Sequence, residues 1–246
     1  MRVLFIEHDH VSPPGAVGQG FLDRGYRIDE LLVVDQAHYT APGVEVAFPE
    51  PTAYDAVVVM GATWGAYEDQ LIGSWLLPEL DLAQRADAAG VPVLGICFGA
   101  QMLARAHGGS VARSPAPEIG WSVVHTDDPS LVPQGPWFQW HSDRWSLPPG
   151  ATEVARNASA SQAFVLRQNM AVQFHPELDS AMLKGWLDNG GADEARARGL
   201  DPDLLLAHVT ALDDESHARA EALVGAFLDQ VAGGALPTRA ATSSRR

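Results

Sequence analysis

Short apolar runs alternate with segments of helical pattern along the first part of the chain. The apolar runs occupy residues 2–7, 27–34 and 55–60. Helices are expected at residues 15–25 and 74–89, and Gly90 is placed to end the second of them. Residues 55–60 are almost continuously apolar, which is typical of a parallel strand buried on both faces. This order predicts a parallel sheet covered by helices, with ligand chemistry at the carboxyl ends of its strands.

The pattern changes between residues 109 and 175. Pieces rich in β-branched and aromatic residues occur there, at residues 121–124 and 163–166. They predict an antiparallel extension of the sheet that returns the chain to His175.

The chain beyond Leu178 is expected to be helical. Asp201 and Pro202 form a good N-cap and first-turn pair for one helix. Five apolar side chains fall on one face of the last helix, namely Leu223, Val224, Phe227, Leu228 and Val231. A stripe of this kind is usually core, so we expect it to dock on the same domain, with the seam of a homodimer as the alternative.

These patterns predict three parts in the chain of 246 residues, which is long enough for a substantial core. Residues 1–190 are expected to form one α/β domain, and residues 191–235 a helical extension packed on it. Residues 236–246 lack apolar anchors and are expected to be a disordered tail.

Cys97 is the only cysteine of the chain, and its position is that of a nucleophile. It follows the apolar residues 93–96 and precedes a helical segment, with Gly95 and Gly99 on either side. A strand that turns sharply into a helix strains the residue at the turn, and glycines remove the side chains that would collide there. The N–H groups and the dipole of the helix then stabilise a thiolate. A lone cysteine more often packs as a small buried hydrophobe, but the flanking glycines favour the nucleophile.

A base for this nucleophile is available 78 positions downstream. His175 and Glu177 are two residues apart, so in a strand they would lie on the same side, with Pro176 turned away. Proline belongs at a strand end, where catalytic side chains are exposed. We therefore expect Cys97 to attack, His175 to carry its proton, and Glu177 to orient the imidazole and stabilise its protonated form.

Together, residues 95–101 (GICFGAQ) and 173–177 (QFHPE) resemble the class I (triad) glutamine amidotransferase family. The closer resemblance is to its free-standing members similar to the glutaminase domain of GMP synthase. The similarity continues through residues 60–69 (MGATWGAYED), 118–121 (EIGW) and 140–145 (WHSDRW). It implies a flavodoxin-like fold, a three-layer α/β sandwich around a central, mostly parallel sheet.

The resemblance also implies a reaction and further site residues. The reaction is cleavage of the γ-amide of glutamine or of a γ-glutamyl compound, through a γ-glutamyl thioester on the cysteine. An oxyanion hole is expected from the backbone N–H groups of Phe98 and Ala62. Many relatives carry Gly-Gly-Pro where this chain has Gly-Ala-Thr at residues 61–63. The expected substrate-binding residues are Gly61, Gln101, His141 and Asp143. For Gln101 the alternative is an amide that satisfies nearby loop backbone.

Composition narrows the range of partners and compartments. The formal net charge is −15, with 31 acidic against 16 basic residues, so we expect no binding to nucleic acid or to anionic membranes. A single cysteine excludes an intramolecular disulfide framework and suits a reducing cytoplasm. Neither an N-terminal signal nor an apolar stretch of roughly 20 residues is found, so a cytoplasmic location is expected.

Three functions stay open. The first is a free-standing hydrolase or transferase acting on glutamine or a γ-glutamyl small molecule. The second is a glutaminase subunit that supplies ammonia to a separate synthase, because the chain has no phosphate loop of its own. The third, a non-catalytic binding relative, is disfavoured by the intact Cys97, His175 and Glu177.

Residues 7–10 (EHDH) are expected to form a loop at the rim of the site. They lack a partner cluster with metal-ligand spacing, so neither a metal nor another cofactor is expected.

Overall fold

The structure is a computed structural model that describes residues 1–233, and a nine-stranded sheet runs through these residues. The strands are β1 Arg2–Glu7, β2 Arg27–Leu32, β3 Ala56–Val59, β4 Val93–Ile96, β5 Ser110–Thr126, β6 Gly135–Ser146, β7 Thr152–Arg156, β8 Ser161–Leu166 and β9 Asn169–Val172. The α-helices are α1 Gly15–Asp23, α2 Asp69–Ala89, α3 Phe98–Ala106, α4 Ser180–Trp186, α5 Ala192–Ala197 and α6 Pro202–Ala226. Short 3-10 turns lie at Gln36–His38 and Pro51–Ala53, and π-helical turns at Leu187–Gly191 and Phe227–Ala232.

Five neighbouring strands form a parallel sheet in the order β2-β1-β3-β4-β9. Alternate residues of these strands face opposite sides. In β1, Val3 and Phe5 pack into one hydrophobic cluster, and Leu4 and Ile6 into the other. The parallel part is therefore buried on both faces, which explains the nearly continuous apolar runs in the sequence.

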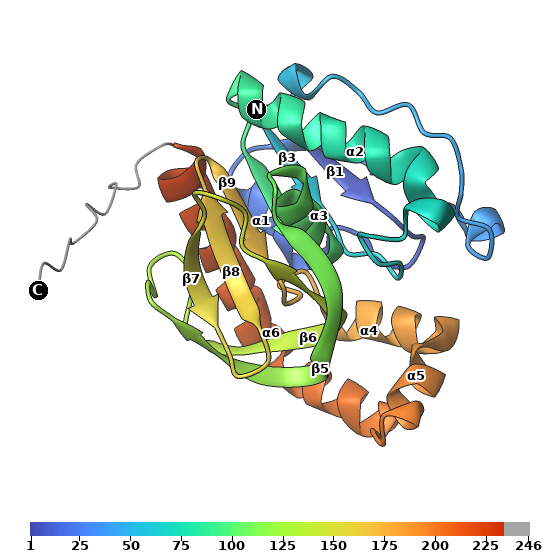
Figure 1. The fold of residues 1–246 in the computed structure, drawn as a ribbon. Coiled ribbons are helices and arrows are strands. Elements are labelled where there is room, and N and C mark those ends of the chain that lie inside the picture. Colours follow the sequence, from blue (N-terminus) through green and yellow to red (C-terminus); the bar gives the residue numbers. More distant parts are fainter. Residues whose placement is uncertain (234–246) are drawn as a thin grey trace, which may run out of the picture.

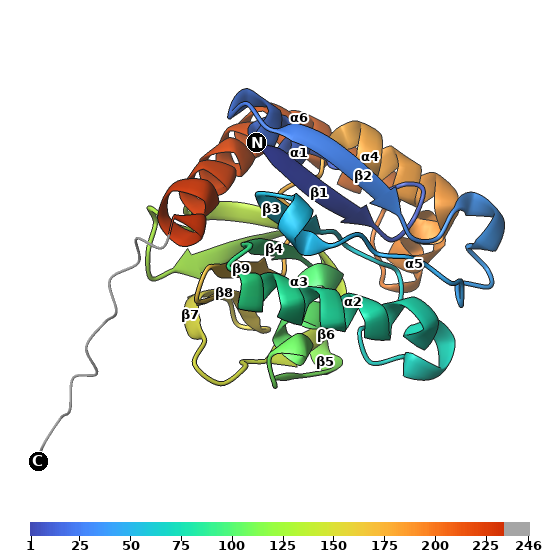
Figure 2. The same cartoon turned by 90° about the horizontal axis from the view of Figure 1, so that it is seen from above.

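Helices cover both faces of the parallel strands, as Figure 2 shows from above. Helices α2 and α3 lie on one face and contribute Trp75, Leu82 and Leu103 to the cluster there. Helices α1 and α6 lie together on the other face. The three-layer α/β arrangement expected from the sequence is thus confirmed.

The remaining strands extend the sheet in antiparallel fashion, in the order β9-β8-β7-β5-β6. Residues 121–124 lie in β5 and residues 163–166 in β8, as expected. The extension brings the chain back through β9 to the neighbourhood of β4, because β9 pairs with both β8 and β4. This return places the segment after β9 close to the end of β4.

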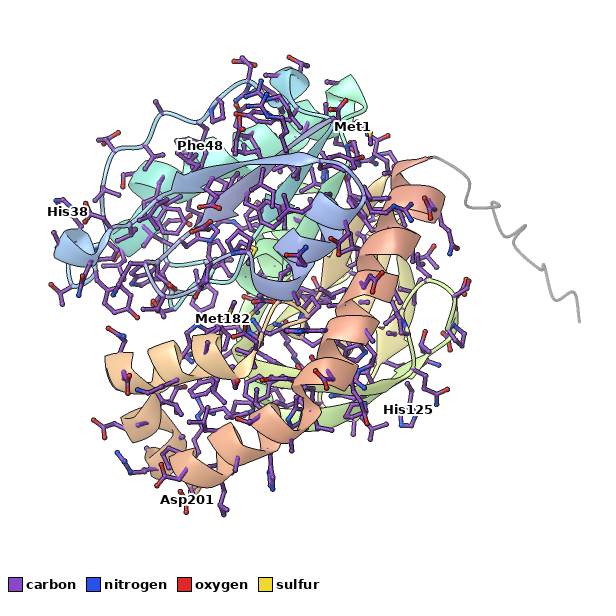
Figure 3. The ribbon with its side chains drawn as sticks, turned by 180° about the vertical axis from the view of Figure 1, so that it is seen from behind. Met1, His38, Phe48, His125, Met182 and Asp201 are labelled. Carbon is purple, nitrogen blue, oxygen red and sulfur yellow. The ribbon has the colours of Figure 1, made fainter. Side chains whose placement is uncertain are left out.

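The C-terminal helices pack on the rest of the chain in two places. Figure 1 shows α4 and α5 below the parallel strands and α6 rising along the side of the sheet. In Figure 3, Met182 on α4 lies near the middle of the molecule and Asp201 marks the far end where α6 begins. The stripe expected on the last helix is buried against α1 and the sheet, through Leu223, Val224 and Phe227. Residues 236–246, expected to be a disordered tail, lie outside the described residues.

Two local predictions differ from the structure. The helix expected at residues 74–89 begins five residues earlier, at Asp69, because Ile72 and Trp75 are drawn into the core ahead of Pro78. The strand expected to reach His175 ends at Val172, so the His-Pro-Glu segment is a loop. The backbone N–H of His175 donates to the carbonyl of Phe138 on β6 instead of joining the parallel ladder. Among residues 1–233, no helix has the length and apolar composition needed to cross a bilayer.

Candidate active site

Cys97 occupies the sharp turn between β4 and α3 that the sequence predicted. Its backbone has φ 51° and ψ −104°, a strained conformation for a residue with a side chain. A Cβ on Gly99 would stand 2.1 Å from the carbonyl oxygen of Val59, and one on Gly95 would stand 2.6 Å from the carbonyl oxygen of Gly99. Both glycines are therefore required for strand and helix to approach each other so closely.

The sulfur of Cys97 lies at the amino-terminal end of α3, where the helix dipole favours negative charge. The side chain is largely buried but lines a cavity. Its Sγ accepts a hydrogen bond from Gln173 Nε2 at 3.6 Å and lies 3.8 Å from the carbonyl oxygen of Trp140. The sulfur therefore accepts from one side-chain amide, while the thiol can donate to the Trp140 carbonyl.

His175 and Glu177 form a buried hydrogen-bonded pair beside this cysteine. Nδ1 of His175 lies 2.7 Å from Oε1 of Glu177, and both residues are almost inaccessible. The opposite nitrogen, Nε2, is buried and has no hydrogen-bond partner within residues 1–233. It is therefore the nitrogen free to exchange a proton with Cys97. Trp186 packs edge-on against the imidazole, with ring centroids 4.9 Å apart, and limits its rotation.

Electrostatics favour the protonated form of this imidazole. Burial lowers the pKa of His175, but the Glu177 carboxylate and the Cys97 sulfur raise it by more, so the pKa lies well above its ordinary value. Because a cation is favoured on His175, this side chain is suited to accept the proton of the Cys97 thiol.

Two backbone N–H groups are available as oxyanion donors. Phe98 is the first residue of α3, so its N–H has no partner within the helix, and Ala62 follows the end of β3. Within residues 1–233 neither N–H donates a hydrogen bond to a protein acceptor. The preceding residue, Gly61, lies against the reacting groups, since a Cβ on it would be 3.2 Å from Cε1 of His175 and 3.9 Å from Cβ of Cys97.

These residues line one cavity of about 600 Å³. The site residues expected from the sequence that line it are Gly61, Ala62, Cys97, Phe98, Gln101, His141, Asp143 and His175. Glu177 lies behind His175 and is not part of the wall. The structure thus places eight of the nine expected residues around a single cavity, with the ninth, Glu177, hydrogen-bonded to His175 behind the wall.

Three polar side chains were expected to bind the substrate, and they have different surroundings: Gln101, His141 and Asp143. The carboxylate of Asp143 lies 3.2 Å from the Tyr67 hydroxyl and 3.6 Å from Nε of Arg113. Burial raises the pKa of Asp143, although Arg113 opposes this effect. The side chains of Gln101 and His141 both contact the backbone oxygen of Asp143, at 3.4 and 2.9 Å. They therefore fix the segment that carries Asp143.

Sequence reasoning missed several residues that shape the site. Gln173 donates to Cys97 and accepts from Gln101 Nε2 at 3.2 Å. It stands two positions before His175, and that spacing could have identified it. Trp186 carried no comparable signal, because it contacts His175 only through the tertiary fold. Of residues 7–10, which were expected to form a loop at the rim of the site, Glu7 is the last residue of β1 and the other three form a bend and turn after it. Asp9 lines the cavity, while His8 is wholly buried. Among residues 1–233, no three His, Cys, Asp or Glu side chains are grouped so that they could hold a metal ion.

Comparisons with known proteins show which family the chain resembles. The family model described as glutamine amidotransferase class-I matches residues 35–189. The γ-glutamyl-L-1-hydroxyisopropylamide hydrolase of a Pseudomonas species is 30% identical over 186 residues, which cover 65% of this chain and 60% of that protein. The glutamine-hydrolysing GMP synthase of Thermomicrobium roseum is 35% identical over 204 residues, which cover 73% of this chain and 36% of the synthase. The chain therefore spans only part of the length of these relatives.

Solved structures resemble the whole described fold. A glutamine amidotransferase from Thermotoga maritima superposes with a TM-score of 0.80 at 30% identity, covering 93% of this chain and 98% of the other. A glutamine amidotransferase from Methylobacillus flagellatus has the same TM-score at 23% identity, covering 94% and 95%, and this shows likeness of fold. The match over residues 35–189 and the 30% identity to the Thermotoga protein establish that the chain belongs to the class I glutamine amidotransferase family.

Proposed function

We propose that the protein cleaves the γ-amide bond of glutamine or of a γ-glutamyl amide through a thioester on Cys97. The observation that carries the proposal is the strained elbow at Cys97 beside the buried His175 and Glu177 pair. A structural cysteine has no need of positive φ, two obligatory glycines and a histidine with a free buried nitrogen. Together these features supply a nucleophile, a proton carrier and a group that orients it.

The first half of the reaction forms the thioester. The proton of the Cys97 thiol passes to Nε2 of His175, and the thiolate attacks the γ-carbonyl carbon of the substrate. The carbonyl oxygen becomes an oxyanion held by the N–H groups of Phe98 and Ala62. The C–N bond then breaks as His175 returns its proton to the leaving nitrogen, which departs as ammonia or an amine.

The second half releases the acyl group. His175 takes a proton from a water molecule, whose oxygen attacks the thioester carbon. The C–S bond breaks and the protonated imidazole returns its proton to the sulfur. Glutamate leaves and the free thiol is restored, so no oxidant, metal or other cofactor is needed. An amine acceptor in place of water would give a γ-glutamyl transfer by the same steps.

The amino-acid end of the substrate is assigned to Asp143. Its carboxylate suits an α-ammonium group, and the neighbouring Arg113 suits an α-carboxylate. Gln101 and His141 hold the backbone of Asp143 in place through its carbonyl oxygen. Gly61 has no side chain and so leaves room for the substrate beside Cys97 and His175. The cavity of about 600 Å³ falls in the range of drug-sized ligands, so it has room for a γ-glutamyl amide larger than glutamine as well as for glutamine.

A second function, ammonia supply to a separate synthase, is favoured by the similarity to glutamine-hydrolysing GMP synthases. A test separates the two functions. The purified chain alone is given glutamine and a panel of γ-glutamyl amides, and released ammonia and amine are measured. Turnover of γ-glutamyl amides by the isolated chain supports the hydrolase, whereas activity that appears only with a synthase supports the subunit. A cytoplasmic location and a homodimer stay predictions beside this proposal.

A further inference from the structure

A second histidine and glutamate pair lies directly behind the candidate active site. His8 follows β1 and Glu79 lies in the middle of α2, and both have no exposed surface. Nε2 of His8 is 3.1 Å from each carboxylate oxygen of Glu79. Within residues 1–233, Glu79 makes no other hydrogen bond or ion pair. Removing two charged groups from water is costly, and replacing such a pair by apolar residues is often neutral or stabilising. Folding stability alone therefore does not explain why His8 and Glu79 are buried together.

The other ring nitrogen of His8 reaches the loop that carries the proposed oxyanion donor. Nδ1 lies 3.0 Å from the carbonyl oxygen of Gly61. A carbonyl oxygen can only accept, so Nδ1 must be the donor, whichever partner holds the proton shared with Glu79. Burial lowers the pKa of His8, but Glu79 and the Gly61 carbonyl raise it by more, which favours a proton on both nitrogens.

This hydrogen bond determines where the Ala62 N–H points. The peptide between Gly61 and Ala62 is trans, so its C=O and N–H point in opposite directions. Because the carbonyl is held inward by His8, the N–H is directed outward to the cavity beside Cys97. A charged donor on the carbonyl also polarises the peptide and makes its N–H a stronger donor.

His8 also contacts the residue that supplies the other donor. Its ring lies against the ring of Phe98, with centroids 4.7 Å apart, and against Trp75 on α2 at 5.3 Å. One buried side chain thus touches both segments whose N–H groups form the proposed oxyanion hole. A rigid, pre-oriented pair of donors is what stabilises an oxyanion without reorganisation during the reaction.

We propose that His8 and Glu79 are positioning residues that orient and polarise the Gly61–Ala62 peptide as an oxyanion donor. The inference rests on the proposed cleavage through Cys97, because an oxyanion arises only in that chemistry. Neither residue touches the substrate. Removing one oxyanion donor outright lowers turnover by about 10²- to 10³-fold in other enzymes. Here the donor stays but loses its orientation, so we expect a loss of about 10- to 100-fold.

The main test replaces both members of the pair. The double variant His8→Leu/Glu79→Leu removes the donor and leaves no unpaired buried charge, so it is expected to fold. Glu79→Gln keeps Nδ1 as a donor but removes the charge, and a smaller loss of about 3- to 10-fold is expected. His125→Gln is the control, since His125 is an exposed histidine on β5 that does not line the cavity.

Two reactions of the same cysteine are then compared. Acylation is followed by p-nitroaniline release from γ-glutamyl-p-nitroanilide in the pre-steady state, or by ammonia release from glutamine. Alkylation is followed with iodoacetamide, whose displacement reaction develops no oxyanion. We expect the double variant to lose 10- to 100-fold in acylation while its alkylation rate stays within about twofold of wild type. A change in general structure would slow both reactions alike.

Each outcome decides the question. The inference is overturned if the folded double variant acylates within threefold of wild type, or if alkylation falls as much as acylation. Cys97→Ala separates this result from the proposed function. If Cys97→Ala keeps activity, or wild type cleaves no γ-glutamyl compound, the proposed function fails and the inference falls with it. If wild type is active, Cys97→Ala is inactive and the double variant is unimpaired, only the role of His8 and Glu79 is refuted.

Discussion

The substitution Glu177→Gln tests the role of the buried carboxylate behind His175. The variant keeps the shape of the side chain but removes its charge. Glu177 makes a 2.7 Å hydrogen bond to Nδ1 of His175 in a site closed to water. A hydrogen bond to a charged group contributes about 1.5–3 kcal/mol, and about 1.4 kcal/mol corresponds to a factor of ten in rate. We therefore expect kcat/KM to fall by about 10- to 150-fold. The loss stays below that of removing His175, because Trp186 still holds the ring in place.

The pH profile gives the same substitution a distinctive signature. The negative charge of Glu177 is the leading cause that raises the pKa of His175 against its burial. Without it the pKa falls, so the imidazolium is lost at a lower pH and the alkaline limb of the kcat/KM profile should move to lower pH. The assay is amine release measured from pH 5 to 10, with the exposed Glu50→Gln as the control. A variant that stays within twofold of wild type, with an unchanged alkaline limb, would refute the assigned role.

Three further substitutions test other parts of the account. His175→Ala should lower kcat/KM by about 10³-fold or more, since it removes the proton carrier, and activity near that of wild type would exclude His175 from the mechanism. Gly99→Ala should cost about 1–3 kcal/mol in urea denaturation, because its Cβ would stand 2.1 Å from the Val59 carbonyl oxygen, and an unchanged midpoint would contradict this. Burial raises the pKa of Glu7 from 4.5 to about 7, and the negative charges of Glu30 and Asp9 add to this effect. The folded state therefore binds the proton of Glu7 more tightly than the unfolded state does. Folding stability is consequently lost as the pH rises between these two values. Because the Glu7 carboxyl is partly exposed and solvent screens part of this effect, Glu7→Gln should add about 1–2 kcal/mol at pH 8 and nothing at pH 4. An equal gain at both values would show that the carboxyl is not the cause.

The elbow at Cys97 could be predicted from the sequence because its requirements are local. Gly95 and Gly99 are needed wherever a strand turns into a helix at so short a distance, and both are visible as residue types. The parallel strands were predictable for a similar reason, since burial on both faces leaves a continuous apolar run. A cysteine nucleophile at such a turn could therefore be predicted from the sequence alone.

The sequence correctly predicted that Glu177 lies beside His175, but it wrongly predicted a strand where the structure has a loop. The pairing with Glu177 was expected from strand alternation, yet β9 ends at Val172. The loop is instead held by the carbonyl of Phe138, a residue of the antiparallel extension. A contact between segments so far apart in the sequence leaves no periodic pattern from which it could be predicted.

The same reason explains why the pair behind the site was missed. His8 and Glu79 are 71 positions apart, and nothing in the segment of either residue indicates the other as its partner. Glu79 lies in a helix whose other buried positions are apolar, and a glutamate there is normally assigned to the surface. Only the three-layer packing brings the two together beneath Gly61.

Cys97 is the residue that we propose becomes acylated. The most direct measurement is the mass of the protein and of its peptides after reaction with a glutamine-like diazoketone. We expect one adduct per chain, located on the peptide that contains Cys97, and no adduct in Cys97→Ala. An adduct on another residue, or equal labelling of the Cys97→Ala variant, would show that Cys97 is not the nucleophile.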